Sequence, residues 1–343
     1  MWYDVNEKLA INGLSYNFMP SWWNKNYGVE FGEKYVFDPD YRVETFMFME
    51  RTVNERFPGL HIGSKHPKPA VIGPDFGNAV TPAAAGCEVV YPVDNYPWNR
   101  HLPGESIKKL KVPQDLGKIF PYKEIISQVS YLNGKLKADV QPCWSVRGVQ
   151  NDAVLIKGTD FFADYYENPE EASILLNYSY SILTSVVKHN YYDFDYRGLV
   201  MLFNCTSIMI SPAAYEEWVL PYEQKIYGLV KELGQKFGVH HCGIFDGYSV
   251  QYRKIPRINL LEIGWDSDIE ASFKLFTEAT IQYIFSPSFL VSANREQIRE
   301  KTGQILESSK KNWDRFRLSV PDIEFGTPDE NLIEIYECCE NVS

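Results

Sequence analysis

Short apolar runs alternate with longer amphipathic segments along the chain from about residue 139 onward. Apolar runs of this length, bounded by turn-forming residues, are typical of buried strands, and the segments between them have helical length. The predicted strands are 139–144, 153–156, 199–204, 238–242, 260–263 and 281–285. A strand followed by a helix, repeated several times, predicts parallel strands joined by helical crossovers.

Helix start signals stand between these runs. Asn168 precedes Pro169 and two glutamates, Ser211 precedes Pro212 at the start of a segment that runs to residue 236, Ser267 and Glu270 have the spacing of a capping box, and Thr327 precedes Pro328. Such residues favour the first turn of a helix because they cap its free N–H groups or fit its first position. No GxGxxG fingerprint of a dinucleotide site occurs. We therefore predict a closed (β/α)8 barrel rather than an open sheet.

The first part of the chain is less regular. Residues 1–65 look helical with polar interruptions, and residues 71–98 are rich in glycine, proline and alanine. Loops of that composition often carry ligand contacts. Neither a short repeat nor a linker composition divides the chain. We expect one domain, 1–343, in which an N-terminal helical elaboration (1–65) precedes the α/β barrel (66–343).

Charge and cysteine content narrow the class of protein. The 343 residues carry a formal net charge of −11, with a pI near 5.2, which argues against nucleic-acid binding because a basic stripe would be expected. No run of about 18 apolar residues is present, so no membrane-spanning helix is predicted. The first residues lack the apolar region of a secretion signal, and the six cysteines are scattered. A reduced, cytoplasmic enzyme is the resulting expectation.

Candidate chemistry is most concentrated in His240-His241-Cys242-Gly243, where an apolar run ends at a glycine. Alternate residues of an extended strand face the same way, so His240 and Cys242 should converge while His241 points elsewhere. An imidazole nitrogen and a thiolate directed to one point suit Zn²⁺, which needs at least a third protein ligand. The alternative is that both histidines are core residues whose nitrogens bond to backbone carbonyls.

A third ligand is expected from a neighbouring strand, because the chemistry of a (β/α)8 barrel lies at the C-terminal ends of its strands. Glu262 is the preferred candidate, since it is a lone acid in an apolar run where an unpaired carboxylate is costly. Cys205, which follows another predicted strand, is the second candidate. Alternatively, Glu262 pairs with Arg253 or Arg257. The alternative for Cys205 is a buried apolar thiol.

Three further acids are candidates for substrate binding. Asp75 and Asp94 follow apolar runs near the start of the chain, and Asp246 lies four residues past Cys242. Asp246 is interpreted either as an acceptor that orients a metal-binding histidine or as a turn residue before Gly247.

Aromatic residues are frequent in the first hundred positions, as in Trp22, Trp23, Tyr91 and Trp98. Most are expected to fill the core. A minority near the ligand would be enough to form a pocket with flat apolar walls, suited to a planar molecule.

Two segments carry a family resemblance. Residues 210–243 combine ISP, a tyrosine, a PY pair and the H-x-C-G element, and residues 327–331 read TPDEN. In these motifs the chain resembles the uroporphyrinogen decarboxylase superfamily and, within it, the cobamide-dependent methyltransferase branch. The similarity spans roughly residues 70–335, and H-x-C-G is its most specific part. It implies a (β/α)8 barrel, in agreement with the pattern above.

Two departures from the family pattern bear on activity. Methyltransferases of this branch that act on coenzyme M complete the zinc site with a cysteine just before TP-x-EN, whereas residues 318–322 contain none. Cys338 and Cys339 lie past this segment and are not assigned to the site. The arginine-rich N-terminal motif of porphyrin decarboxylases is also absent. The chain therefore looks more like the methyltransferase I components that demethylate aromatic methyl ethers.

This resemblance implies zinc-dependent transfer of a methyl group from an aryl methyl ether to the Co(I) corrinoid of a separate corrinoid-binding protein. His240 and Cys242 would be catalytic as zinc ligands, with zinc acting as a Lewis acid on the ether oxygen. Three alternatives stay open: a methylcobamide:thiol methyltransferase of the coenzyme M type, a metal-free decarboxylase of an aromatic acid that uses Asp75 or Asp94, and a non-catalytic ligand-binding barrel.

Overall fold

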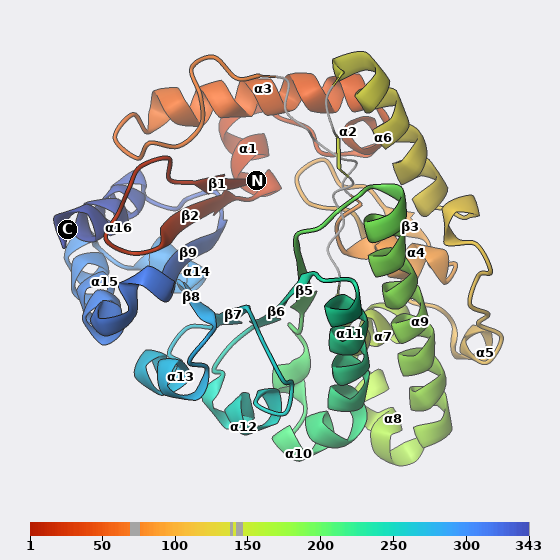
Figure 1. The fold of residues 1–343 in the computed structure, drawn as a ribbon. Helices are drawn as coiled ribbons and strands as arrows, with labels where there is room; N and C mark the ends of the chain where they lie inside the picture. Colours follow the sequence, from red (N-terminus) through yellow and green to blue (C-terminus); the bar gives the residue numbers. More distant parts are fainter. Residues whose placement is uncertain (69–75, 138–139, 142–146, 343) are drawn as a thin grey trace.

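A computed structural model describes residues 1–68, 76–137, 140–141 and 147–342. Its centre is a curled sheet with the strand order β1-β2-β9-β8-β7-β6-β5 (Figure 1). Neighbouring strands in this sheet are parallel, except that β1 and β2 are antiparallel. The strands are Trp2–Asp4 (β1), Gly13–Phe18 (β2), Leu199–Phe203 (β5), Lys236–His241 (β6), Leu260–Ile263 (β7), Thr280–Ile284 (β8) and Phe316–Ile323 (β9). Val89–Val90 (β3) and Trp98–Asn99 (β4) form a separate antiparallel pair.

Helices surround the curled sheet (Figure 1). Those before β5 are Pro20–Tyr27 (α1), Glu33–Phe37 (α2), Pro39–Arg56 (α3), Val80–Ala84 (α4), Gly104–Ile107 (α5), Tyr122–Leu136 (α6), Val149–Lys157 (α7), Phe161–Glu167 (α8) and Pro169–Asp193 (α9). Those after β5 are Pro212–Ala214 (α10), Leu220–Glu232 (α11), Ser249–Tyr252 (α12), Ile269–Leu275 (α13), Pro287–Ser292 (α14), Arg295–Ser309 (α15) and Asp329–Asn341 (α16). A π-helical turn, Tyr215–Val219, joins α10 to α11. Short 3₁₀ turns are Gly77–Ala79, Leu116–Lys118, Ser207–Met209, Asp246–Tyr248 and Lys310–Arg315.

The predicted alternation of strands and helices is confirmed from β5 to β8, which overlap the predicted runs 199–204, 238–242, 260–263 and 281–285. The prediction of a strand at 153–156 is wrong, because these residues lie within α7, where Ala153 and Ile156 are buried. A four-residue apolar run does not distinguish a strand from one face of a buried helix. Of the run 139–144, only residues 140 and 141 fall within the described residues.

The expectation that residues 1–65 are helical holds for α1, α2 and α3 and is wrong for β1 and β2. In β2, Ser15 and Asn17 alternate with Tyr16 and Phe18, which is the period of a strand. Ser15 pairs in parallel with Ser319 of β9. The N-terminal segment therefore contributes to the central sheet as well as to the helical layer.

Several helix starts follow their predicted signals. α9 begins at Pro169, and Ser211 caps α10 by accepting a backbone N–H at 3.1 Å. α16 begins at Asp329, one residue past the predicted proline. The capping box at Ser267 is wrong: Asp268 caps α13 instead, accepting a backbone N–H of the first turn at 2.8 Å. Aspartate is as good a cap as serine and lies one residue nearer the helix.

Register in the sheet sorts apolar and polar side chains onto opposite faces. Val239 of β6 pairs with Leu261 of β7, and both are fully buried. The next residues along these strands, His240 and Glu262, also pair with each other. Because successive side chains of a strand face opposite sides, the same register that builds the core places an imidazole beside a carboxylate on the other face.

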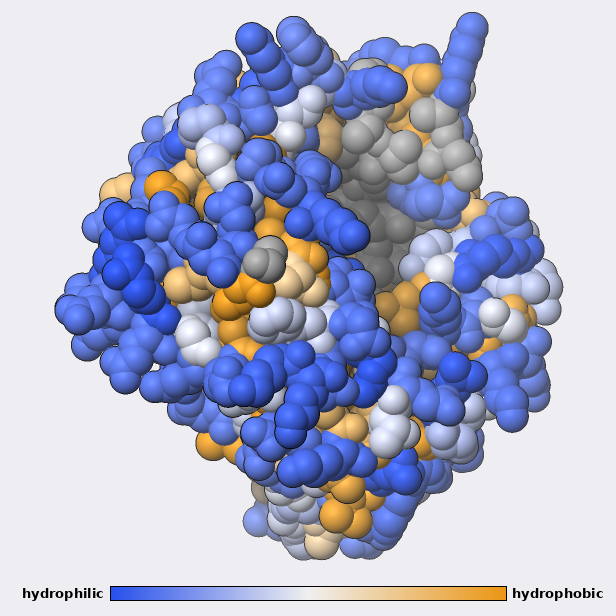
Figure 2. Space-filling view, turned by 60° about the vertical axis from the view of Figure 1, so that its left-hand side comes forward, coloured by the Kyte–Doolittle hydropathy of each residue, from blue (hydrophilic) through white to orange (hydrophobic). Residues whose placement is uncertain are grey.

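The surface seen in Figure 2 is mostly hydrophilic, with scattered apolar patches and a hollow. Within the described residues, no helix combines the length and the apolar character that crossing a membrane requires.

Candidate metal centre

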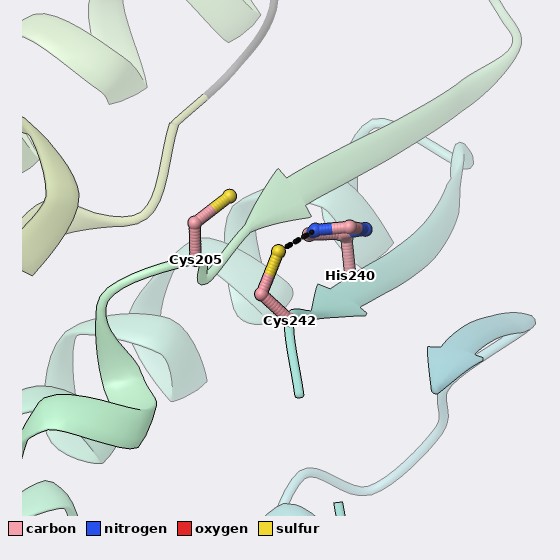
Figure 3. Close-up of side chains that lie close together, drawn as sticks. All are labelled: Cys205, His240 and Cys242. Carbon is pink, nitrogen blue, oxygen red and sulfur yellow. Dashed lines mark hydrogen bonds between the residues drawn. The ribbon is translucent and has the colours of Figure 1, made fainter. Parts of the chain in front are cut away.

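Two cysteines and a histidine meet where β5 and β6 end. Cys205 follows β5, His240 lies in β6, and Cys242 is one residue past its end. One ligand atom from each side chain lies within 4.8 Å of the other two. Figure 3 shows the three side chains together, with the hydrogen bond between Nε2 of His240 and Sγ of Cys242, 3.0 Å long.

The pairing of β5 with β6 brings Cys205 to this point. Phe203 of β5 is the register partner of His240, and the backbone N–H of Asn204 donates to the carbonyl of His240 at 2.9 Å. Cys205 is the next residue and therefore lies beside the end of β6. The ring of Phe203 also packs against the imidazole, with ring centroids 5.2 Å apart.

The alternation expected along β6 is found. His240 and Cys242 face the same point, whereas His241 is fully buried on the other side, where its Nδ1 lies 3.1 Å from the hydroxyl of Tyr252. Its ring also packs against Tyr248, with centroids 4.8 Å apart. His241 is thus a core residue between strand and helix, but its Nδ1 contacts a tyrosine hydroxyl and not the backbone carbonyl that the core interpretation expected.

Glu262 contacts His240 from the side away from the thiols. Its Oε2 lies 2.9 Å from Nδ1 of His240, and its Oε1 accepts a hydrogen bond from Gln282. The geometry therefore favours Cys205 over Glu262 as the third member of the group, with Glu262 orienting the imidazole. The two arginines considered as partners of Glu262 have other contacts: Arg257 pairs with Glu278, and Arg253 lies over the ring of Phe276.

The surroundings of the two thiols favour ionisation of Cys205 over that of Cys242. The hydrogen bond from Cys242 lowers the pKa of Cys205 against the effect of burial, and the hydrogen bond of His240 lowers it further. Nη1 of Arg147 approaches the same sulfur at 3.8 Å. The hydrogen bond between Cys205 and Cys242, together with burial, raises the pKa of Cys242. Burial alone would lower the pKa of His240, but its hydrogen bonds to Cys205 and Glu262 raise it to about 10. A thiolate is the form of cysteine that binds metals.

The N-terminal turn of α7 anchors the loop after β5. Oδ1 of Asn151 accepts hydrogen bonds from both the backbone N–H and the hydroxyl of Thr206, at 2.9 and 2.6 Å. Nε2 of Gln150 donates to the carbonyl of Thr206 at 2.9 Å. Both side chains thereby restrain the residue next to Cys205. Sequence reasoning missed them, since it predicted a strand just after them, at 153–156; the only signal was two adjacent amide side chains, separated from that apolar run by Asp152.

The remaining predicted acids lie elsewhere. Asp75 is outside the described residues. Asp94 is partly exposed, and a carboxylate oxygen lies 3.9 Å from Nζ of Lys25. Asp246 accepts the backbone N–H of Asp268 at 2.9 Å, so Glu262 and not Asp246 is the acceptor on His240.

Several aromatic residues of the N-terminal region pack together in the core. Trp22, Trp23, Phe18 and Phe57 are fully buried, and the rings of Phe18 and Trp22 lie 4.6 Å apart. The expectation that these rings fill the interior therefore holds for Trp22 and Trp23, whereas Tyr91 is only partly buried and Trp98 is 46% exposed.

Residues 70–341 match the family described as uroporphyrinogen decarboxylase (URO-D). Uroporphyrinogen decarboxylase of Prochlorococcus marinus (strain NATL2A) is 23% identical over 257 residues, 71% of this chain and 71% of that relative. Uroporphyrinogen decarboxylase of Hordeum vulgare is 22% identical over 174 residues, 50% of this chain and 52% of that relative. A methyltransferase from Methanosarcina mazei has a similar structure, with a TM-score of 0.68, 14% identity, and coverage of 99% of this chain and 94% of that one. At this identity the likeness shows a shared fold.

Proposed function

The chain belongs to the uroporphyrinogen decarboxylase family, and from this premise we propose that it is a zinc-dependent methyltransferase. The observation that carries the proposal is the group formed by Cys205, His240 and Cys242, whose ligand atoms lie within 4.8 Å of one another. The fold shared with the methyltransferase from Methanosarcina mazei supports the proposal of a methyltransferase. The proposal includes a closed (β/α)8 barrel, to which β2 and β5 to β9 contribute parallel strands.

The residues of this group fit Zn²⁺. Two thiolates and an imidazole are ligands that zinc prefers, and three protein ligands leave a fourth position for a substrate atom. Nδ1 of His240 is held by Glu262, the arrangement typical of metal-binding histidines. The approach of Arg147 to Cys205 favours the thiolate form, because a cationic donor stabilises a negative acceptor.

Bound zinc would supply a Lewis acid for the oxygen of an ether substrate. The chain's own residues prepare its ligands: Glu262 and Gln282 hold the imidazole of His240, and the loops after β5 and β6 bring both sulfurs to one point. In the proposed reaction the bond between the methyl carbon and the oxygen of an aryl methyl ether breaks. The methyl group passes to the Co(I) corrinoid of a partner protein, and the phenolate leaves.

A corrinoid-binding partner would have to reach the loops that carry the thiols. Ile208 and Met209 follow Cys205 and are 44% and 60% exposed, and Ile244 follows Cys242 and is 56% exposed. Exposed apolar side chains that lie close together are typical of contact surfaces. Their position next to the ligands supports docking over these two loops.

One observation favours a second candidate, a methylcobamide:thiol methyltransferase. Thiol activation in the resembled branch uses two cysteines and a histidine, and the segment before TP-x-EN lacks the expected cysteine. Cys205 provides a second sulfur from a different strand. The composition of the group is therefore compatible with a thiol substrate in the fourth position.

An anaerobic assay separates these candidates. The zinc-loaded chain is mixed with a Co(I) corrinoid protein and a panel of aryl methyl ethers, and the cobalt spectrum is followed. Formation of methylated corrinoid that depends on both ether and zinc is the expected result, with loss in Cys242→Ser and retention in Cys338→Ser. Transfer from methylated corrinoid to a thiol, with every ether unchanged, would assign the second candidate. Absence of transfer in either direction would contradict both.

A further inference from the structure

Behind the group of Cys205, His240 and Cys242 lies a buried chain of hydrogen bonds. Its members are Tyr215, Glu223, Asn204, Tyr252 and His241, each of them 0–1% exposed. The hydroxyl of Tyr215 donates to Oε2 of Glu223, and Nδ2 of Asn204 donates to Oε1 of Glu223 at 2.6 Å. Nδ2 of Asn204 also lies 3.1 Å from the hydroxyl of Tyr252, which lies 3.1 Å from Nδ1 of His241.

This group of hydrogen-bonded residues includes two that are adjacent in sequence to the proposed ligands. Asn204 directly precedes Cys205, and His241 stands between His240 and Cys242. Both N–H groups of the Asn204 amide are used, one on Glu223 and one on Tyr252. The carboxylate therefore fixes the orientation of this amide, and through Tyr252 the end of β6 is tied to the same point.

The π-helical turn between α10 and α11 helps to align the first two members of this hydrogen-bonded group. Eight residues along a regular α-helix correspond to a rotation about 80° beyond two full turns, so the side chains of Tyr215 and Glu223 would point in directions about 80° apart. The wider turn over Tyr215–Val219 takes up an additional residue and brings both side chains to the same side. π-helical turns of this kind frequently occur at functional sites.

Glu223 is an unusual residue to bury. Among the residues that the structure describes, its polar contacts are neutral donors, the hydroxyl of Tyr215 and the amide of Asn204, and burial raises its pKa to about 7 against the effect of these two bonds. An acid buried without a cation costs free energy that an apolar residue would not. A role that offsets this cost is to hold the amide beside Cys205, through the oxygen that accepts the hydrogen bond of Asn204.

We propose that Glu223 is a positioning residue for the metal centre: it orients Asn204, and with Tyr252 it sets the spacing between Cys205 and the His240–Cys242 pair. This inference rests on the proposed zinc site. Glu223 touches none of the three ligands in the contacts described above, so its effect is expected on metal affinity and not on the number of metal ions bound.

The test compares Glu223→Leu with Glu334→Leu, a matched control. Glu334 is an equally buried acid, 2% exposed at its side chain, but it lies on α16 and pairs with Arg295 and Arg299. Zinc affinity, measured by competition with a chromogenic chelator, is expected to fall about 10- to 100-fold in Glu223→Leu. It is expected to stay at the wild-type value in Glu334→Leu. Glu223→Gln, which keeps one amide oxygen for Asn204, should recover most of the affinity.

Tyr252→Phe provides a second test that does not depend on the folding of Glu223→Leu, since it removes a single hydroxyl. Its zinc affinity is expected to fall about tenfold. Wild-type affinity in Tyr252→Phe, together with wild-type affinity in any folded Glu223→Leu, would overturn the inference.

A zinc-free readout separates this inference from the proposed function. Alkylation of Cys205 in the metal-free protein, resolved by mass spectrometry, is expected to change in rate in Glu223→Leu and Tyr252→Phe but not in Glu334→Leu. If the wild-type chain binds no zinc, the proposed function fails, and the positioning role is then decided by this rate: an unchanged rate would overturn it.

Discussion

Oε2 of Glu262 lies 2.9 Å from Nδ1 of His240, while Nε2 of the same imidazole lies 3.0 Å from Sγ of Cys242. The ring is therefore held by an acid on one side and directed toward a thiol on the other. The second oxygen of Glu262 accepts a hydrogen bond from Gln282, which fixes the acid itself. An acid that only orients a histidine and an acid that binds the metal should respond differently to removal.

Replacement of Glu262 by alanine is expected to weaken zinc binding about 10- to 100-fold, because the imidazole loses its orientation. At saturating zinc, the variant should still bind one ion per chain, since the three proposed ligands remain. The Kd is measured by chelator competition and the stoichiometry by mass spectrometry. Glu270→Ala, at a 63% exposed side chain on α13, is the control. Loss of stoichiometric zinc in Glu262→Ala would instead identify Glu262 as a ligand.

Asn151→Ala is expected to loosen the loop that carries Cys205. Thr206 would lose the acceptor of its backbone N–H and its hydroxyl, which should lower the free energy of unfolding by about 1–2 kcal/mol. The zinc Kd should also rise about tenfold, as for other residues that support metal ligands. Asn177→Ala is the control, because this amide bonds to Ser173 within α9. An unchanged Kd in Asn151→Ala would show that the loop holds its position without this anchor.

The parts of the site that can be predicted from the sequence are those that depend on residues close together along the chain. The convergence of His240 and Cys242 follows from the period of two along a single strand, which is local information. The choice of Cys205 over Glu262 as the third ligand does not follow from local information, because the sequence does not tell which strands are neighbours. Only the register of Phe203 with His240 places Cys205 beside β6, and only the register of His240 with Glu262 places that acid at Nδ1.

The fold shows the same division. The alternation of strands and helices from β5 onward can be predicted from apolar runs and capping residues. The parallel pairing of β2 with β9 joins segments about 300 residues apart, and the polar Ser15 and Asn17 interrupt the apolar pattern of β2. Nothing in the sequence of either segment predicts that it pairs with the other. The anchoring by Asn151 is hidden for a related reason, since its partner Thr206 lies 55 residues further along the chain.

Glu334→Gln tests the packing of α16 against α15. Glu334 pairs with Arg295 and Arg299, and their hydrogen bonds, that of Arg299 first, lower its pKa despite burial. At pH 7 the variant is expected to be less stable by about 1.5–3 kcal/mol, the range for hydrogen bonds to a charged group. Because the folded-state pKa lies below the unfolded value, near 4.3, this stabilisation is complete above about pH 5 and is lost as the pH falls through the lowered pKa.

Urea unfolding at a series of pH values measures this difference. The gap between wild type and Glu334→Gln should narrow as the solution becomes more acidic. Glu300→Gln, at an exposed position on α15, should stay within about 0.5 kcal/mol of wild type throughout. A gap that stays constant down to the lowest pH would contradict the assigned charge of Glu334.

The most direct measurement for the proposed metal centre is the absorption spectrum of the Co²⁺-substituted protein. Charge-transfer bands from thiolate to Co²⁺ report how many sulfurs bind the metal, because each coordinated thiolate adds intensity. One Co²⁺ per chain is expected, displaced by Zn²⁺. The band should lose about half of its intensity in Cys205→Ser and in Cys242→Ser, because each substitution removes one of the two thiolates proposed as ligands. It should lose none in Cys338→Ser. Failure to bind a stoichiometric metal ion, or full intensity in Cys205→Ser, would contradict the site described here.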